Sequence, residues 1–179
     1  MLEIHTSSVN SGKSIVLIGL MGSGKTTIGQ KLSYKLNLPF IDSDEEVVKA
    51  SGCSIPDIFR VYGEEAFRDT EKKIMLRCLN EKPTIIATGG GAFLNQEIRK
   101  KIGERGISVW LRASLDILEK RTANQIGRPL LDDDEPRRKL SEFIALRYPI
   151  YAKADIIVDT GKESAAATVN SVYNALRTE

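Results

Sequence analysis

The sequence of 179 residues predicts a single α/β domain with a five-stranded parallel sheet flanked by helices. Three observations lead to this fold class. Short apolar runs alternate with helix-like segments, the first run leads directly into a glycine-rich loop, and the length suits one sizeable hydrophobic core. The predicted strands cover residues 14–18, 39–41, 84–88, 107–111 and 155–158.

Four of the predicted strands are followed by a turn that contains glycine or aspartate. These turns begin at Gly19, Asp42, Gly89 and Asp159. In open parallel sheets, ligands bind in the crevice outside the carboxyl ends of the strands. The first three turns are therefore candidates for building a site, and the fourth lies near the end of the chain.

Helices are predicted between the strands. They cover residues 25–36, 64–79, 115–121, 136–148 and 164–176. A further helix start is predicted at Ser54, which is a capping residue followed by Pro56 in the first turn. Ser114 is expected to cap the helix at 115–121.

The two remaining segments are polar. Residues 122–134 fit neither a helical nor a strand period, and a stretch of this kind in a compact domain is typical of a functional loop. We therefore expect a mobile lid here, carrying Arg128. Residues 1–13 lack the apolar centre of a secretory signal and are expected to form a polar leader, so that the domain covers residues 14–179.

The composition excludes several classes of protein. The formal net charge of +2 is too small to indicate a nucleic-acid or membrane partner, and no apolar run approaches the ~20 residues that cross a bilayer. Cys53 and Cys78 are too few for a disulfide framework or a zinc cluster. The only histidine, His5, lies in the leader, so no Ser-His-Asp or Cys-His site is expected. The low cysteine content favours a reducing, cytoplasmic compartment, and we expect a monomer that acts on small molecules.

The glycine-rich loop carries the strongest functional signal. Gly19-Leu20-Met21-Gly22-Ser23-Gly24-Lys25-Thr26 matches G-x-x-x-x-G-K-[ST], which cradles phosphate groups. The apolar run before it and the helix-like segment after it supply the strand-loop-helix context that such a loop requires. In this motif Lys25 reaches the β- and γ-phosphates and Thr26 ligates Mg²⁺.

Two carboxylates follow the second predicted strand. In an extended chain, side chains two residues apart point to the same side, so Asp42 and Asp44 are both expected to face the phosphate loop. One can hold the water shell of Mg²⁺, and the other can orient a substrate hydroxyl or accept its proton. The alternative is a solvated turn that caps a helix at Glu45. The neighbouring phosphate loop favours the functional interpretation.

Glycines and arginines supply the other candidates. Residues 89–91 are three consecutive glycines after the third strand, which favours close approach of a ligand over a simple tight corner. Arg68, Arg121, Arg128 and Arg147 each carry a planar fork that can grip a carboxylate or a phosphate. On spacing alone, each of these arginines is expected to be a surface charge.

These motifs together resemble those of the shikimate kinase family, from about residue 14 to the last helix. The motifs that carry the resemblance are residues 19–29, Asp42-x-Asp44, Gly63-Glu64 with Phe67-Arg68 and Glu71, residues 89–91, Arg128-Pro129-Leu130-Leu131, and Arg147 followed by Tyr151. The resemblance implies a P-loop kinase fold with a mobile lid. It also implies transfer of the γ-phosphate of ATP to the 3-hydroxyl of shikimate, with Mg²⁺ as the metal.

The resemblance further implies a role for each matching residue. The residues implied to bind ATP are Gly22, Ser23, Gly24, Lys25, Thr26, Thr27, Arg121 at the adenine, and Arg128 at the transferred phosphate. The residues implied to act on Mg²⁺ are Thr26 and Asp42. The residues implied to bind shikimate are Asp44, which would also be the base, Arg68 and Arg147 at the carboxylate, and Gly89, Gly90 and Gly91. Lys25, Asp44 and Arg128 are the implied catalytic residues.

Two alternatives stay open at this stage. One is another small-molecule kinase of the same fold, such as a gluconate or nucleoside-monophosphate kinase. The other is a catalytically silent nucleotide-binding module that regulates a partner.

Residues 159–164 lack the proline that some shikimate kinases place against the adenine, so this loop is a departure from the family pattern.

Overall fold

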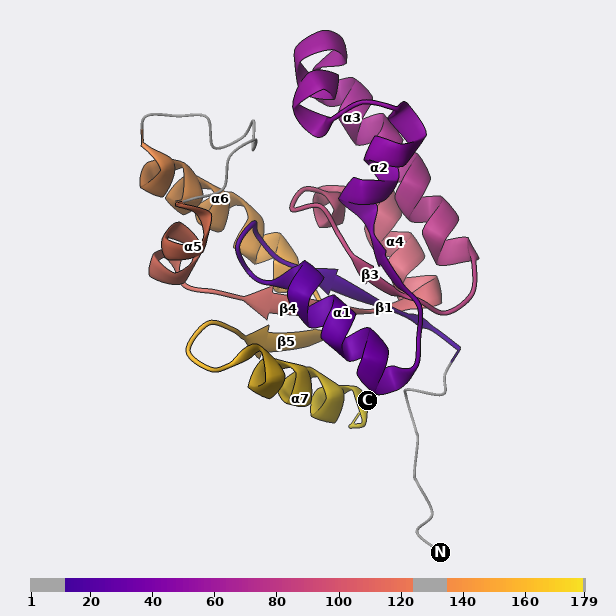
Figure 1. The fold of residues 1–179 in the computed structure, drawn as a ribbon, viewed down its shortest axis with the longest axis vertical. Coiled ribbons are helices and arrows are strands. Elements are labelled where there is room, and N and C mark those ends of the chain that lie inside the picture. Colours follow the sequence, from indigo (N-terminus) through magenta and orange to yellow (C-terminus); the bar gives the residue numbers. More distant parts are fainter. Residues whose placement is uncertain (1–11, 124–134, 179) are drawn as a thin grey trace, which may run out of the picture.

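The structure is a computed structural model that describes residues 12–123 and 135–178. Its centre is a parallel sheet with the strand order β2-β3-β1-β4-β5 (Figure 1). The strands are β1 (Ser14–Ile18), β2 (Phe40–Asp42), β3 (Ile85–Ala87), β4 (Gly106–Arg112) and β5 (Ile156–Asp159). The predicted five-stranded parallel sheet is confirmed, and every strand boundary lies within one residue of its predicted position.

The central strand shows why the apolar runs are continuous rather than alternating. All five residues of β1 are buried. Val16 and Ile18 belong to the hydrophobic cluster on one face of the sheet, whereas Ile15 and Leu17 belong to the cluster on the other face. A parallel sheet covered on both sides has no solvent-facing side, so each position of its inner strand is apolar or small.

The helices cover the two faces of the sheet unequally. They are α1 (Lys25–Leu36), α2 (Ser43–Ser51), α3 (Ile55–Asn80), the 3₁₀ turn η1 (Ala92–Leu94), α4 (Gln96–Arg105), α5 (Leu115–Thr122), α6 (Pro136–Tyr151) and α7 (Ala165–Leu176). Helices α1 and α7 lie together on one face, and the cluster on the opposite face is built from α3, α4 and α6 (Figure 1). Of the described helices, none is long and apolar enough to cross a membrane.

Most predicted helices are confirmed, with three differences. The segments beginning at Ser54 and at Glu64 are one helix, α3, which bends at Gly63 (φ 82°, ψ 171°). Helix α6 runs one turn past the predicted end and contains Pro149. Helix α4 is not indicated by the apolar pattern, because Ile98 and Ile102 are its only buried side chains.

Two boundary details bear on the predicted lid and cap. Ser114 occupies the N-cap position of α5, but its side chain makes no capping hydrogen bond there. Thr122 is buried and donates to the Leu118 carbonyl, so it ends α5 rather than opening a loop. The rest of the predicted lid, with Arg128, lies outside the described residues apart from Ala123.

Candidate active site

The phosphate loop connects β1 to α1 as the motif predicts. Gly22 (φ 81°) and Gly24 (φ 95°) have backbone conformations that residues with a side chain rarely adopt. The Lys25 ammonium folds back over the loop and donates to the carbonyls of Gly19 at 2.8 Å and Leu20 at 3.0 Å. The first turn of α1 carries unsatisfied N–H groups and the positive end of the helix dipole. It therefore lies next to the positive charge of the Lys25 ammonium.

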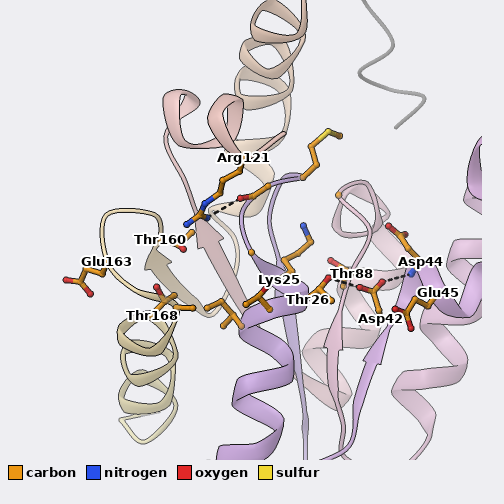
Figure 2. A pocket seen from close by; sticks show the side chains of 17 residues that line it. Lys25, Thr26, Asp42, Asp44, Glu45, Thr88, Arg121, Thr160, Glu163 and Thr168 are labelled. Atoms are coloured by element: carbon orange, nitrogen blue, oxygen red, sulfur yellow. Dashed lines mark hydrogen bonds between the residues drawn. The ribbon is translucent and has the colours of Figure 1, made fainter. Parts of the chain in front are cut away.

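A cavity of about 600 Å³ opens at the carboxyl edge of the sheet around this loop (Figure 2). The predicted site residues that line it are Gly22, Gly24, Lys25, Thr26, Thr27, Asp42, Asp44, Gly90 and Arg121. The phosphate loop, both carboxylates and Gly90, the middle residue of the glycine triplet, thus meet at one place, as the strand-end argument predicts, whereas Gly89 and Gly91 do not line the cavity. Phosphates bound to the loop would lie beside the two carboxylates.

Asp42 and Asp44 reach the cavity by a route that differs from the prediction. The strand ends at Asp42, and Asp44 lies in the first turn of α2, so the prediction that both lie in extended chain is wrong. Asp42 caps that helix by accepting from the Asp44 N–H at 3.0 Å. Its other oxygen accepts from the Thr26 hydroxyl at 2.8 Å. Asp42 therefore caps α2 and also lines the cavity, whereas the roles of the two carboxylates stay a prediction.

The three glycines after β3 make room for charged side chains. A Cβ on Gly89 would lie 2.5 Å from Glu71 Oε1 and 2.7 Å from Asp44 Oδ1, and a Cβ on Gly91 would overlap the Arg68 guanidinium. The Gly89 N–H donates to the buried Ser43 hydroxyl at 3.0 Å, so this donor is used within the protein. The triplet is therefore a packing surface, on which carboxylates and guanidinium groups approach the backbone.

Arg68 is held by two carboxylates from its own helix. Its Nη1 donates to Glu71 at 2.9 Å, and its Nη2 and Nε donate to Glu64 at 3.1 and 3.3 Å. Although burial disfavours its charge, Glu71 and Glu64 raise the pKa of Arg68. Burial also raises the pKa of the Glu71 carboxyl, which is 2% exposed, and Arg68 opposes that rise. Arg68, which is half-buried, and the buried Glu71 thus form an ion pair at the edge of the glycine triplet.

Arg147 reaches the same triplet from α6. It is 6% exposed, and its Nη1 donates to the Gly90 carbonyl at 3.2 Å. Arg68 and Arg147 therefore approach neighbouring glycines from different helices. The expectation from spacing that both are surface charges is wrong, because Arg147 is buried and Arg68 is half-buried against the triplet.

The other predicted residues are placed as follows. Arg121 lines the cavity, and its Nη1 donates to the Gly22 carbonyl at 3.1 Å (Figure 2). Ser23 does not enter the cavity: its side chain is 1% exposed and packs against Gly19, and its N–H donates to Leu20. Arg128 lies outside the described residues.

Sequence analysis missed several residues that line the cavity. They are Met21, Ile28, Glu45, Thr88, Thr160, Glu163, Ala165 and Thr168. Thr88 and Thr160 directly follow β3 and β5, so the rule that sites form at strand ends was the signal available for them. Glu163 lies in the segment 159–164, to which the family resemblance points, whereas Ala165 and Thr168 carried no signal because α7 is placed by its packing on α1 and β5.

Comparisons with known proteins identify the family of this chain. The family model for shikimate kinase matches residues 21–177. A shikimate kinase from Paramagnetospirillum magneticum is 48% identical over 167 residues, which cover 93% of this chain and 86% of that protein.

Solved structures give the same result. A shikimate kinase from Acinetobacter baumannii in complex with shikimate superposes with a TM-score of 0.91 at 32% identity, covering 97% of both chains. A shikimate kinase from Aquifex aeolicus gives a TM-score of 0.78 at 37% identity, covering 91% of this chain and 95% of the other. The predicted fold is therefore confirmed, and this chain belongs to the shikimate kinase family of ATP-dependent transferases.

Proposed function

We propose that this chain transfers the γ-phosphate of ATP to the 3-hydroxyl of shikimate, giving shikimate 3-phosphate and ADP. One observation carries this proposal beyond family membership. Two guanidinium groups, the half-buried Arg68 and the buried Arg147, lie on the glycine triplet whose middle residue, Gly90, also lines the phosphate-loop cavity. Paired guanidinium groups suit a carboxylate, which an acidic acceptor such as shikimate offers and a neutral sugar does not.

The donor side of the reaction uses the phosphate loop. Lys25 would leave the carbonyls that it contacts in the free protein and bind the β- and γ-phosphates, together with the N–H groups of residues 22–27. Phosphoryl transfer depends mainly on alignment and charge neutralisation, so a fixed cation and helix N-terminus lower its barrier. Arg121 and the neighbouring Thr160 would bind the nucleoside end.

The side chains of Thr26 and Asp42 have the chemistry that Mg²⁺ prefers in its ligands. The Thr26 hydroxyl and the Asp42 carboxylate are hard oxygen ligands 2.8 Å apart, and Mg²⁺ is commonly held by one or two such groups with waters and substrate phosphates. When bound, Mg²⁺ would neutralise charge on the phosphates. The protein's part is to hold Asp42 in place, through Thr26 on one oxygen and the Asp44 N–H on the other.

The acceptor side uses residues from three helices. Arg68 and Arg147 would bind the acceptor carboxylate and thereby aim one ring hydroxyl at the γ-phosphate. Asp44 lies in the same cavity as Lys25 and would orient that hydroxyl and accept its proton. Gly89, Gly90 and Gly91 would contact the ring. Arg128, from the predicted lid, would steady the transferring phosphate and help to exclude water.

The deciding experiment is ADP release, measured by a coupled assay with ATP and Mg²⁺ in the presence and absence of shikimate. We expect release that depends on shikimate, and much less with gluconate or nucleoside monophosphates. Release with gluconate instead would indicate the related kinase class. ATP binding without release for any acceptor would indicate a silent regulatory module. We also propose a cytoplasmic monomer, for which light scattering of the purified chain tests the oligomeric state.

A further inference from the structure

The backbone carbonyl of Gly90 accepts two side-chain hydrogen bonds from α6. Tyr151 donates its hydroxyl to this oxygen, and Arg147 Nη1 donates to it at 3.2 Å. The two donors are four residues apart and so are neighbours on one face of the helix. A carbonyl oxygen has two lone pairs, so it can accept both bonds at once. The phosphate-loop cavity, which Gly90 lines, is thereby connected to α6 through a single oxygen atom.

Both donors are buried, which fixes their orientation. Tyr151 is 0% exposed and packs beside the rings of Phe93, Trp110 and Tyr148. Burial raises the pKa of Tyr151 to about 12, so its hydroxyl keeps its proton and remains a donor at any working pH. The Arg147 guanidinium carbon lies 4.1 Å from the ring centre of Phe143.

The peptide between Gly90 and Gly91 lies between the two guanidinium groups. Its carbonyl holds Arg147, and the Cα of Gly91 packs against the guanidinium of Arg68. A peptide unit is planar, so fixing the carbonyl direction also fixes the plane that leads into Gly91. Tyr151 does not line the cavity. Its hydroxyl nevertheless sets the orientation of the Gly90–Gly91 peptide, which Arg68 and Arg147 both contact.

We propose that Tyr151 is a positioning residue for the acid group of the acceptor, acting through the Gly90 carbonyl on the spacing of Arg68 and Arg147. This inference rests on the function proposed above. Without the hydroxyl, the carbonyl keeps only the bond from Arg147, and the peptide gains freedom to rotate. The two guanidinium groups then no longer match the spacing of one carboxylate before it binds, and binding loses this preorganisation.

Tyr148 provides a matched control within the same aromatic cluster. It lies on the same helix, and its hydroxyl also donates to a backbone carbonyl, that of Ala113, away from the glycine triplet. Tyr151→Phe and Tyr148→Phe each remove one partly or fully buried hydroxyl that binds a carbonyl. We expect both to lower stability by a similar amount, because each removes one such hydrogen bond.

The kinetic test measures KM for shikimate, KM for ATP and kcat in both variants. For Tyr151→Phe we expect KM for shikimate to rise about 5- to 10-fold, as for the loss of one hydrogen bond, with KM for ATP and kcat within about 2-fold of the parent. For Tyr148→Phe we expect no change in either KM. An unchanged KM for shikimate in Tyr151→Phe, or an equal rise in Tyr148→Phe, overturns the proposal.

A second measurement does not depend on the identity of the acceptor. Loss of the bond to the Gly90 carbonyl changes the environment of the Gly91 N–H in the same peptide, so its amide NMR resonance should shift in Tyr151→Phe and stay in place in Tyr148→Phe. A Gly91 resonance that does not move in Tyr151→Phe also overturns the proposal. If the parent is inactive with shikimate, the proposed function fails, and the resonance alone decides whether Tyr151 positions the triplet.

Discussion

The Thr26 hydroxyl donates a 2.8 Å hydrogen bond to one carboxylate oxygen of Asp42, which ties the first turn of α1 to the end of β2. The other carboxylate oxygen of Asp42 caps α2 through the Asp44 N–H. One side chain therefore links the phosphate loop to the helix that carries the proposed base. A change at Asp42 affects both the charge near the phosphates and the start of α2.

Two substitutions at Asp42 separate these effects. Asn caps helices as well as Asp does, so Asp42→Asn should keep α2 while removing the charge. We expect it to raise the Mg²⁺ concentration for half-maximal rate by about 10-fold or more, with thermal stability near that of the parent. Asp42→Ala should in addition lose about 1 kcal/mol of stability. Mg²⁺ titrations measure the metal requirement of each variant, and thermal unfolding measures its stability. An unchanged Mg²⁺ requirement in Asp42→Asn would show that Asp42 does not belong to the metal site.

Asp44→Asn tests the proposed base. The variant keeps the shape of the side chain but accepts a proton poorly, so we expect kcat to fall by about 10²-fold or more. Single-turnover rates with saturating ATP and shikimate are the measurement. A fall of only a few-fold would leave Asp44 with a role in orienting the hydroxyl and none in proton transfer.

Glu64 is expected to compete with the substrate for Arg68. In the free protein its exposed carboxylate binds Nη2 of Arg68 at 3.1 Å, so an acidic acceptor has to displace it. Exposed ion pairs are worth about 0–1 kcal/mol, so Glu64→Gln should lower KM for shikimate by up to about 5-fold without changing kcat. Asp69→Asn is the control, because Asp69 pairs with Lys73 on the same helix, and it should leave KM unchanged. A KM in Glu64→Gln equal to or above that of the parent contradicts the competition.

Gly89→Ala tests whether the glycine triplet is a packing surface. The new methyl group would lie 2.5 Å from Glu71 Oε1 and 2.7 Å from Asp44 Oδ1. Both of these oxygen atoms are buried. We expect a loss of about 1–3 kcal/mol in the free energy of unfolding and a higher KM for shikimate. Gly103→Ala, within α4 and with no atom within 4 Å of the new Cβ, should instead gain about 0.5–1 kcal/mol. Urea unfolding measures the free energy of unfolding of both variants. Equal stability of Gly89→Ala and Gly103→Ala would show that the triplet can accommodate a methyl group and is not tightly packed.

The raised pKa of Glu71 predicts that this residue contributes less to stability as pH rises. Burial raises its pKa above the ordinary value of 4.5, so the folded protein binds this proton more tightly than the unfolded chain. The stability of the parent relative to Glu71→Gln should therefore be greatest below about pH 4.5 and fall as pH rises through the folded-state pKa. Urea unfolding of both proteins at about pH 4.5 and about pH 8 measures the difference. A difference that grows with pH would mean that Arg68 outweighs burial.

The sequence by itself determined the phosphate loop and the edge of the sheet where the site forms. The strand, glycines and helix from Ser14 to Leu36 are contiguous, and their local propensities all agree, so even the bounds of α1 were predictable. The carboxyl ends of all strands lie at one edge of a parallel sheet, so Asp42 and the glycine triplet were predictable at the same edge as the loop, and the strand order β2-β3-β1 makes them neighbours.

Only the tertiary structure decided what surrounds the glycine triplet. Arg147 lies 57 residues from Gly90 in sequence, and its spacing is that of an ordinary surface arginine. It reaches the triplet because α3, α4 and α6 share one apolar cluster on the same face of the sheet. Such long-range packing depends on the fit of whole helices, which no local pattern of residues encodes. The same packing buries Glu71 and Tyr151, and it places ionic side chains against the glycines that the sequence had marked only as candidates for ligand contact.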